Sequence, residues 1–249
     1  MLAVALAFQF LTTIPIPVWR KPSVSELGQA QRYFPLVGAT VGLLLVGGDL
    51  LFGSVLPTLV VGALLIALQT GITGALHLDG FADCCDALLG PKEVERRLEI
   101  LRDSRIGSYG SAGLICLLLV KYAALVSLAG PWRWGGLVAM PTLGRWSMVY
   151  ALTSFPYARP AGAGSAFKQS ASRGSLAIAS LCTAALVGVS LGFWGLAAMG
   201  LTWVIAWGLG RLTLTRIPGL TGDAYGAINE VVEAAVLLLV VALGTRGLL

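Results

Sequence analysis

A stretch without any charged residue, from Gly174 to Gly210, most constrains the fold of this chain. At about 1.5 Å per residue, one helix over this stretch would be much longer than the roughly 30 Å of a bilayer core. Two helices with a turn near residues 190–195 fit it better. Only 12% of all residues are charged, against about 25% in soluble domains. The sequence therefore predicts an all-α, polytopic membrane helix bundle.

Hydropathy predicts about seven transmembrane helices, preceded by an N-terminal interfacial or re-entrant helix that breaks at Pro15 and Pro17. The expected spans are 35–53, 56–76, 109–130, 134–154, 175–192, 193–210 and 230–248. We expect residues 1–249 to form a single integral membrane domain, because no soluble segment separates these spans. Gly38 and Gly42 have the small-xxx-small spacing that lets two membrane helices approach closely.

Basic residues are biased to one side of these spans. Thirteen of the 17 Lys and Arg residues fall in segments on the same side as residues 77–108, and two fall on the other side. The remaining two, Lys121 and Arg145, lie within spans. Cytoplasmic loops of membrane proteins are enriched in Lys and Arg, so the polar segments are expected to face the cytoplasm.

The segment "HLDGFADCCDALLG" (77–90) places three carboxylates at the end of an apolar span. Asp79, Asp83 and Asp86 are spaced i, i+4, i+7 and would share one narrow face of a helix. Like charges at this spacing repel one another. A hard divalent cation would reverse the repulsion, and oxygen ligands favour Mg²⁺, Mn²⁺ or Ca²⁺ over zinc. We interpret these acids as a magnesium site; the alternative is a solvated acidic turn at a membrane edge.

A second polar segment, "EVERRLEILRDSRIGSYG" (93–110), is expected to form a short amphipathic helix followed by a glycine-containing loop. In it, Asp103 lies between Arg102 and Arg105. A carboxylate that binds metal, arginines that donate to phosphate oxygens and glycines that expose backbone N–H groups would together suit a phosphate ester. The alternative is a surface helix whose charges balance one another.

Two further segments place polar residues on the same side of the membrane. Arg145 lies inside a span, where an arginine is costly and needs a partner or a ligand, and Arg159 follows that span. The segment before the last span adds Asp223, Asn229 and Glu230. The alternative is that this segment is a helix-capping loop whose acids stabilise a helix N-terminus. His77, the only histidine, is either structural or a proton acceptor.

At these residues the sequence resembles the bacterial cobalamin synthase (adenosylcobinamide-GDP ribazoletransferase) family. The motifs that carry the resemblance are "HLDGFADCCDALLG", "RRLEILRDSRIGSYG", "GRWSMVYALTSFPYARPAGAG" and "TGDAYGAINEVVEA". The resemblance implies a magnesium-dependent phosphotransferase that moves the adenosylcobinamide-phosphate group from adenosylcobinamide-GDP to alpha-ribazole or its 5′-phosphate. Such an enzyme releases GMP and forms adenosylcobalamin or its 5′-phosphate, which belongs to the last part of vitamin B12 assembly.

The site residues then divide by expected role. The expected metal ligands, for Mg²⁺, are Asp79, Asp83, Asp86 and Asp103. The expected catalytic groups are Asp83, Asp86, Asp103 and His77. The expected substrate contacts are Arg102, Arg105, Arg145, Arg159, Asp223, Asn229 and Glu230. The expected location is the bacterial cytoplasmic (inner) membrane, with the active site facing the cytoplasm. The lipid bilayer is an expected partner, nucleic acid is not, and a homo-oligomer is left open.

The aspartate motif is also similar to that of CDP-alcohol phosphotransferases, which implies a related fold. Their pattern has an aspartate where this chain has Leu76. Two other functions are kept as alternatives: a CDP-alcohol lipid phosphotransferase and a membrane transporter. The charges gather at one membrane edge, whereas transporter sites usually lie near the bilayer midplane.

Overall fold

A computed structural model describes residues 2–18, 20, 22–128, 130–159 and 163–247. Their elements are α1 (Leu2–Leu11), α2 (Val24–Ala30), the 3₁₀ turn η1 (Gln31–Tyr33), α3 (Phe34–Gly53), α4 (Thr58–Thr73), α5 (Leu76–Leu88), α6 (Val94–Ile100), α7 (Ser108–Ser127), α8 (Gly130–Ser154), α9 (Ala163–Gln169), α10 (Arg173–Leu191), α11 (Phe193–Leu214) and α12 (Gly222–Thr245). Apart from one bridge between Tyr157 and Leu220, these residues contain no β-structure. The all-α prediction is confirmed. Residues 160–162 of the "RPAGAG" loop lie outside the described residues.

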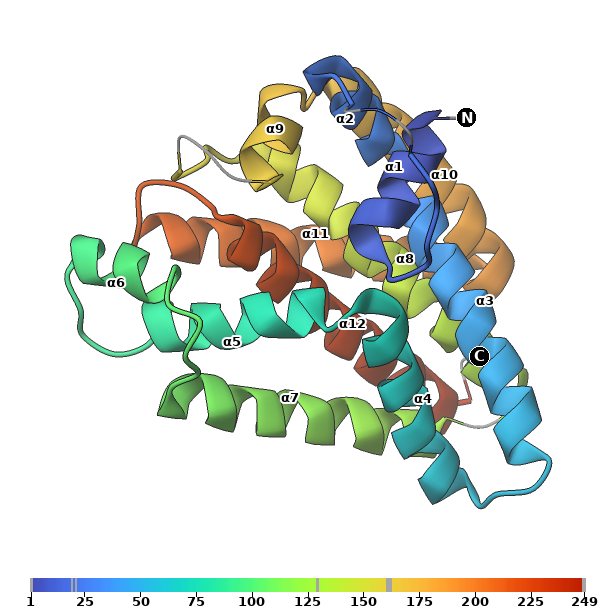
Figure 1. The fold of residues 1–249 in the computed structure, drawn as a ribbon. Coiled ribbons are helices and arrows are strands. Elements are labelled where there is room, and N and C mark those ends of the chain that lie inside the picture. Colours follow the sequence, from blue (N-terminus) through green and yellow to red (C-terminus); the bar gives the residue numbers. More distant parts are fainter. Residues whose placement is uncertain (1, 19, 21, 129, 160–162, 248–249) are drawn as a thin grey trace.

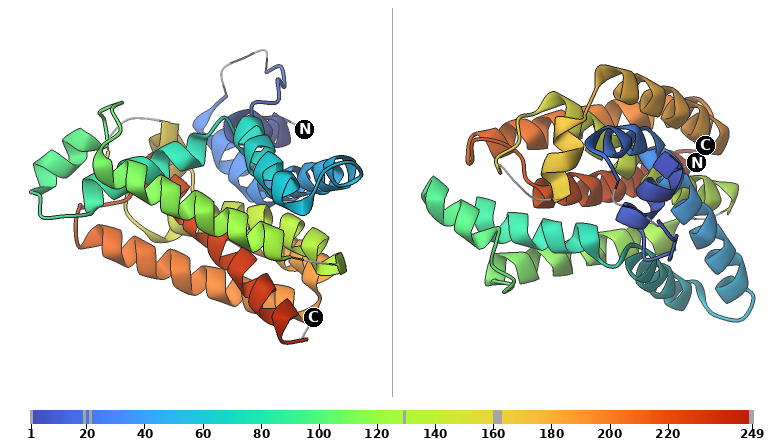
Figure 2. Two further views of the ribbon diagram at one scale, coloured as in Figure 1. Left: turned by 90° about the horizontal axis from the view of Figure 1, so that it is seen from below. Right: turned by 45° about the horizontal axis from the view of Figure 1, so that its top comes forward.

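The charge-free stretch forms two helices, α10 and α11, as predicted. They join at Gly192, whose φ of +58° lies in the left-handed region that glycine adopts without strain. The two helices pack against each other. In Figures 1 and 2, α11 lies on the opposite side of the bundle from α4.

Five helical stretches in the described ranges are long and apolar enough to cross a membrane: Val24–Gly53, α7, α10, α11 and α12. The count rises to six if α4 and α5, which meet at 93°, form one broken span. The chain therefore has the helices of a multi-pass membrane protein. The predicted span 134–154 is not among the five or six, although α8 covers it.

Helix α8 is long enough to span but is surrounded by protein. It packs against α3, α10, α11 and α12, and its middle residues are almost all buried. A helix that faces other helices instead of lipid can carry polar side chains, provided that they find partners. Thr142, Arg145 and Ser147 are accordingly fully buried there.

The two glycines singled out in α3 bring that helix directly onto α8. A Cβ added to Gly42 would lie 2.6 Å from the Cα atom of Val138, and one added to Gly38 would overlap the backbone of Pro141. The expected close approach at the small-xxx-small pair is therefore confirmed.

At the N-terminus, α1 ends at Leu11, before the prolines. Its buried residues include Leu6 and Leu11, and the helix packs on α2 and α3. The following chain is held by the Thr13 amide, which donates to the Ile72 carbonyl at 2.7 Å. The expected short helix is present; its interfacial position in a membrane stays a prediction.

Helix α5 lies lengthwise between α7 and α12, and it contacts both (Figure 1). Its far end continues toward α6, at the left of that figure. The α3–α4 turn lies at the other side of the molecule, at the lower right. The polar segments around α5 and α6 are thus gathered at one end of the bundle.

This arrangement predicts opposite membrane sides for the exposed residues Ser54, in the α3–α4 turn, and Glu93, just before α6. In a variant whose native cysteines are replaced by alanine, we expect Ser54→Cys to react with a membrane-impermeant maleimide from outside intact cells. Glu93→Cys should react only after permeabilisation, because the charge bias places it in the cytoplasm. Labelling of both positions from the same side would contradict this topology.

Candidate active site at the crossing of two helices

The acidic helix α5 starts at a sharp change of direction after α4. Gly74 and Ala75 have φ values of 61° and 58°. Ala75 is the only non-glycine residue in the described chain with positive φ, a conformation that costs free energy without a glycine. These two residues turn the chain through the 93° between the helices. Asp79, Asp83 and Asp86 then lie on one helix, as predicted.

Two glycines let α5 and α12 cross in backbone contact. A Cβ on Gly80 would lie 2.8 Å from the carbonyl oxygen of Asp223, and one on Gly226 would lie 3.2 Å from the Cα of His77. The residues beside Gly80 are therefore brought to the first turn of α12. Asp83 lies within electrostatic range of both Asp79 and Asp223.

A pocket of about 210 Å³ opens at this crossing. Its polar lining comes from α5, α12 and the chain after α8: His77, Asp79, Tyr157, Arg159, Asp223 and Tyr225. Phe10, Met148, Leu152 and Phe167 supply apolar walls. The Tyr157 and Tyr225 rings stack at 6.2 Å between centroids with 12° between their planes. The pocket combines acidic, basic and aromatic groups in one place.

Arg159 reaches the pocket because the chain after α8 is tied to the chain before α12. The Ala158 amide donates to the Leu220 carbonyl at 2.8 Å, and the Leu220 amide donates to the Pro156 carbonyl at 2.8 Å. Arg159 Nη2 then donates to Asp223 Oδ2 at 2.9 Å and to the Leu101 carbonyl at 2.6 Å. The structure therefore brings Arg159 and Asp223 together at the pocket, and their expected contacts with substrate stay predictions.

Three buried polar atoms of the pocket lining have no hydrogen-bond partner in the described structure: His77 Nε2, Arg159 Nε and Tyr225 Oη. A buried polar atom left unpaired costs about 1–3 kcal/mol. Such atoms are normally paired with protein, water or a ligand. Their concentration in one pocket makes this pocket the candidate functional site.

Asp86 lies apart from this pocket and holds the start of α7. Its carboxylate accepts hydrogen bonds from the Gly107 and Gly110 amides at 2.7 and 2.9 Å. A side chain on either glycine would collide with that carboxylate. The structure therefore gives Asp86 a capping contact, and its expected metal and catalytic roles stay predictions.

Asp103 and Arg105 bind each other in the loop between α6 and α7. Arg105 Nη2 donates to Asp103 Oδ2 at 2.7 Å, and the arginine side chain is 84% exposed. The hydrogen bond from Arg105 lowers the pKa of Asp103 to about 2. Arg102 is exposed nearby. None of the three lines the pocket, so their expected roles as metal ligand or phosphate contacts stay predictions.

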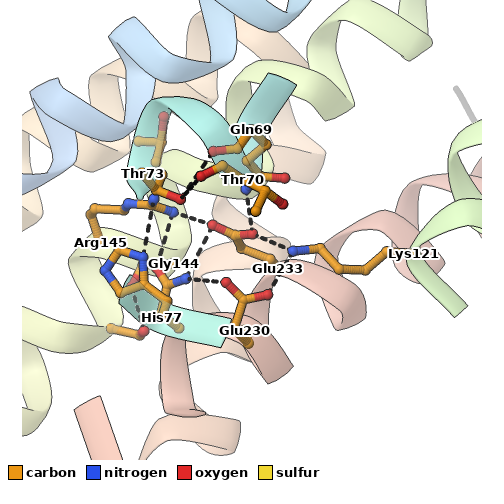
Figure 3. Close-up of polar contacts among 12 residues, drawn as sticks. Gln69, Thr70, Thr73, His77, Lys121, Gly144, Arg145, Glu230 and Glu233 are labelled. Carbon is orange, nitrogen blue, oxygen red and sulfur yellow. Dashed lines mark hydrogen bonds and ion pairs between the residues drawn. The ribbon is translucent and has the colours of Figure 1, made fainter. Parts of the chain in front are cut away.

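Arg145, Asn229 and Glu230 lie deeper, in a buried charge network (Figure 3). Arg145 pairs with Glu233. Lys121 Nζ lies 2.8 Å from Glu230 and 2.6 Å from Glu233. Two cations are thus paired with two carboxylates. Arg145 therefore has the partner that an arginine within a membrane span is expected to need. All these side chains are at most 5% exposed.

Neutral side chains complete the buried charge network. Gln69 Nε2 donates to Glu233 Oε2 at 2.6 Å, and Arg145 Nη1 donates to Asn229 Oδ1 at 3.1 Å. The network therefore joins α4, α7, α8 and α12. Substrate contacts for Arg145, Asn229 and Glu230 stay predictions, because none of them lines the pocket.

Sequence analysis missed several residues that the structure makes important. The sequence pattern predicts no functional role for Gln69 or Arg97, and it uses Lys121 only for topology. Arg97 is 3% exposed and donates to the Ala87 and Gly90 carbonyls, which end α5. A lysine within a span is a usable signal for a buried partner, whereas nothing local distinguishes Arg97 from its charged neighbours.

The family model described as Cobalamin-5-phosphate synthase matches residues 3–241. Similar proteins named adenosylcobinamide-GDP ribazoletransferase occur in Geotalea daltonii (37% identity, 97% of each chain), Roseiflexus sp. (37%, 93% of this chain and 86% of the relative) and Stutzerimonas stutzeri (38%, 96% and 97%). No solved structure matches the chain.

The buried charge network predicts a double-mutant signature. Glu233→Gln leaves two buried cations facing one carboxylate, and breaking a buried pair costs about 3–5 kcal/mol. The double variant R145M/E233Q removes one charge of each sign and leaves Lys121 paired with Glu230. We expect it to lose clearly less stability than Glu233→Gln alone, measured by detergent-induced unfolding followed by circular dichroism. Equal or greater loss in the double variant would mean that the charges are not balanced as described.

Proposed function

Because the chain belongs to the Cobalamin-5-phosphate synthase family, we propose that it transfers the adenosylcobinamide-phosphate group from adenosylcobinamide-GDP to alpha-ribazole or its 5′-phosphate. GMP leaves, and adenosylcobalamin or its 5′-phosphate forms. Apart from the relatives' names, the main support for this proposal is the pocket. There, Asp79 of α5 and Asp223 of α12 lie with Arg159, which has an unpaired N–H. This combination suits a pyrophosphate.

We propose Asp79 and Asp83 as the residues that hold Mg²⁺. Among the described side chains, no three of His, Cys, Asp or Glu converge as a ready ligand set. Magnesium does not require one, because it usually binds through one or two carboxylates together with substrate phosphates and water. Asp79 and Asp83 fit this mode, since neither carboxylate has a hydrogen bond or ion pair to the described chain. Bound there, the ion would neutralise charge on the pyrophosphate.

Of the two proposed ligands, Asp79 lines the pocket and Asp83 lies one helical turn further along α5. The other groups of the pocket lining would act by position and charge, as is usual in phosphoryl transfer. Arg159 is held by Asp223, so its free Nε–H can donate to a phosphate oxygen. The attacking hydroxyl loses a proton, and an α5 carboxylate oxygen that does not bind the ion can accept it. The stacked Tyr157 and Tyr225 offer aromatic surface to a ring of the substrate.

The pocket size indicates which part of the substrate it encloses. Its roughly 210 Å³ is below the roughly 300–1,000 Å³ of pockets that enclose drug-sized ligands. We therefore infer that the pyrophosphate region enters the pocket and that the corrinoid ring stays outside it.

We propose the bacterial cytoplasmic membrane as the location, with the pocket facing the cytoplasm. The basic residues of the polar segments support this orientation. We also propose α8 as the seventh span, although its composition alone does not mark it. The acidic helix packed in a helical bundle supports a fold related to the CDP-alcohol phosphotransferases.

The proposal is tested by incubating purified protein with adenosylcobinamide-GDP, alpha-ribazole and Mg²⁺ and measuring released nucleotide. We expect GMP release that requires magnesium. Asp79→Asn and Asp83→Asn should each lower the rate about a hundredfold or more, because a metal ion contributes several kcal/mol to such a reaction. Glu95→Gln, which alters an exposed acid of α6 outside the pocket, is the matched control.

Two results would overturn the proposal. Release of CMP from a CDP-alcohol, with none of GMP from adenosylcobinamide-GDP, would favour the lipid phosphotransferase. Full activity and an unchanged magnesium requirement in both aspartate variants would remove Asp79 and Asp83 as ligands.

A further inference from the structure

His77 stands where the pocket meets the buried charge network. Its side chain is 2% exposed and lines the pocket, and its Nδ1 atom faces Arg145 (Figure 3). Its backbone is fixed against Gly226 of α12. The imidazole therefore connects the network to the space that a ligand would occupy.

The contact with Arg145 indicates which ring nitrogen of His77 carries the proton. Arg145 Nη2 lies 3.4 Å from His77 Nδ1. A guanidinium has only donors and stays charged, so this contact is a hydrogen bond in the tautomer whose Nδ1 accepts with its lone pair. A neutral imidazole with a free Nδ1 lone pair carries its proton on Nε2. The contact therefore favours a neutral histidine that presents an N–H from Nε2.

Arg145 can hold this tautomer because the buried charge network fixes it. Glu233 binds its guanidinium and Asn229 accepts from the same Nη1 atom, which leaves Nη2 for His77. The second cation, Lys121, balances the remaining carboxylate charge. The arginine is therefore charged and oriented without any ligand.

The Nε2 atom has no partner within the described chain. Arg159 Nε is a second unpartnered donor of the same pocket lining. Two donors without acceptors call for an acceptor-rich group, and phosphoryl oxygens are such acceptors.

We propose that His77 donates a hydrogen bond from Nε2–H to a phosphoryl oxygen of the bound substrate, and that Arg145 is the positioning residue that sets this tautomer. The identity of the acceptor rests on the proposed function. His77 does not serve as the general base, since its only lone pair already accepts from Arg145. The proton acceptor is then a carboxylate.

The tautomer is tested directly by NMR, because His77 is the only histidine of the chain. Protein labelled with ¹⁵N-histidine and purified without a histidine tag gives one pair of ring-nitrogen signals. We expect a protonated Nε2 and an unprotonated Nδ1 in the absence of substrate. A proton on Nδ1, alone or together with one on Nε2, would overturn the proposal. This measurement needs no catalytic activity, so it fails or succeeds separately from the proposed function.

The transfer rates of His77 variants distinguish a hydrogen-bond donor from a general base at this position. H77Q places an amide N–H near the position of Nε2 and cannot act as a base, whereas H77A removes the donor. We expect H77A to lose about ten- to hundredfold in transfer rate, as for a hydrogen bond to a charged group. H77Q should stay within a few-fold of the wild type. Equal losses in both variants, with both folded, would overturn the donor role.

The role of Arg145 is tested in the R145M/E233Q variant, whose remaining buried charges stay paired. Methionine cannot donate to Nδ1, so the ring-nitrogen signals of His77 should shift toward a mixture of both tautomers. An unchanged spectrum, with Nε2 still fully protonated, would show that Arg145 does not position the ring.

Discussion

Two cations and two carboxylates buried among membrane helices are the constraint on which the rest of this structure depends. Lys121 of α7 and Arg145 of α8 are paired with Glu230 and Glu233 of α12, and Gln69 of α4 donates into the same group. Each charge would be costly alone in such surroundings. Packing of α7, α8 and α12 that brings all four charges together is therefore favoured over packing that leaves any of them unpaired.

Along α5 and α12, some polar side chains stabilise the fold and others are available to a ligand. Toward the interior, His77 contacts the buried charge network through Arg145. One turn further out, Gly80 brings α5 onto the backbone of Asp223, and Asp79 and Asp83 remain without partners in the described chain. The charges that hold the fold together are thus paired, while the carboxylates of Asp79 and Asp83 stay available to a ligand.

Sequence could predict the features that depend on local pattern. The turn at Gly192, the contacts of Gly38 and Gly42 and the helical acidic segment follow from charge-free length, residue size and spacing. The capping of α7 by Asp86 could not be predicted, because it depends on where α7 starts relative to α5. Hydropathy also predicts that the last span begins at residue 230, whereas α12 starts at Gly222. The polar residues in the first turns of α12 face protein instead of lipid. Hydropathy does not identify such residues as part of a membrane helix.

The central proposal is that the α5 carboxylates hold a metal ion together with the substrate pyrophosphate. The most direct test is electron–nuclear double resonance with Mn²⁺ in place of Mg²⁺. The samples are the wild-type protein and the D79N/D83N variant, each with adenosylcobinamide-GDP bound. Our account predicts a phosphorus hyperfine coupling in the wild type that is absent without substrate and lost in the double variant. A coupling that persists in the variant, or an ion that binds equally well without substrate, would contradict it.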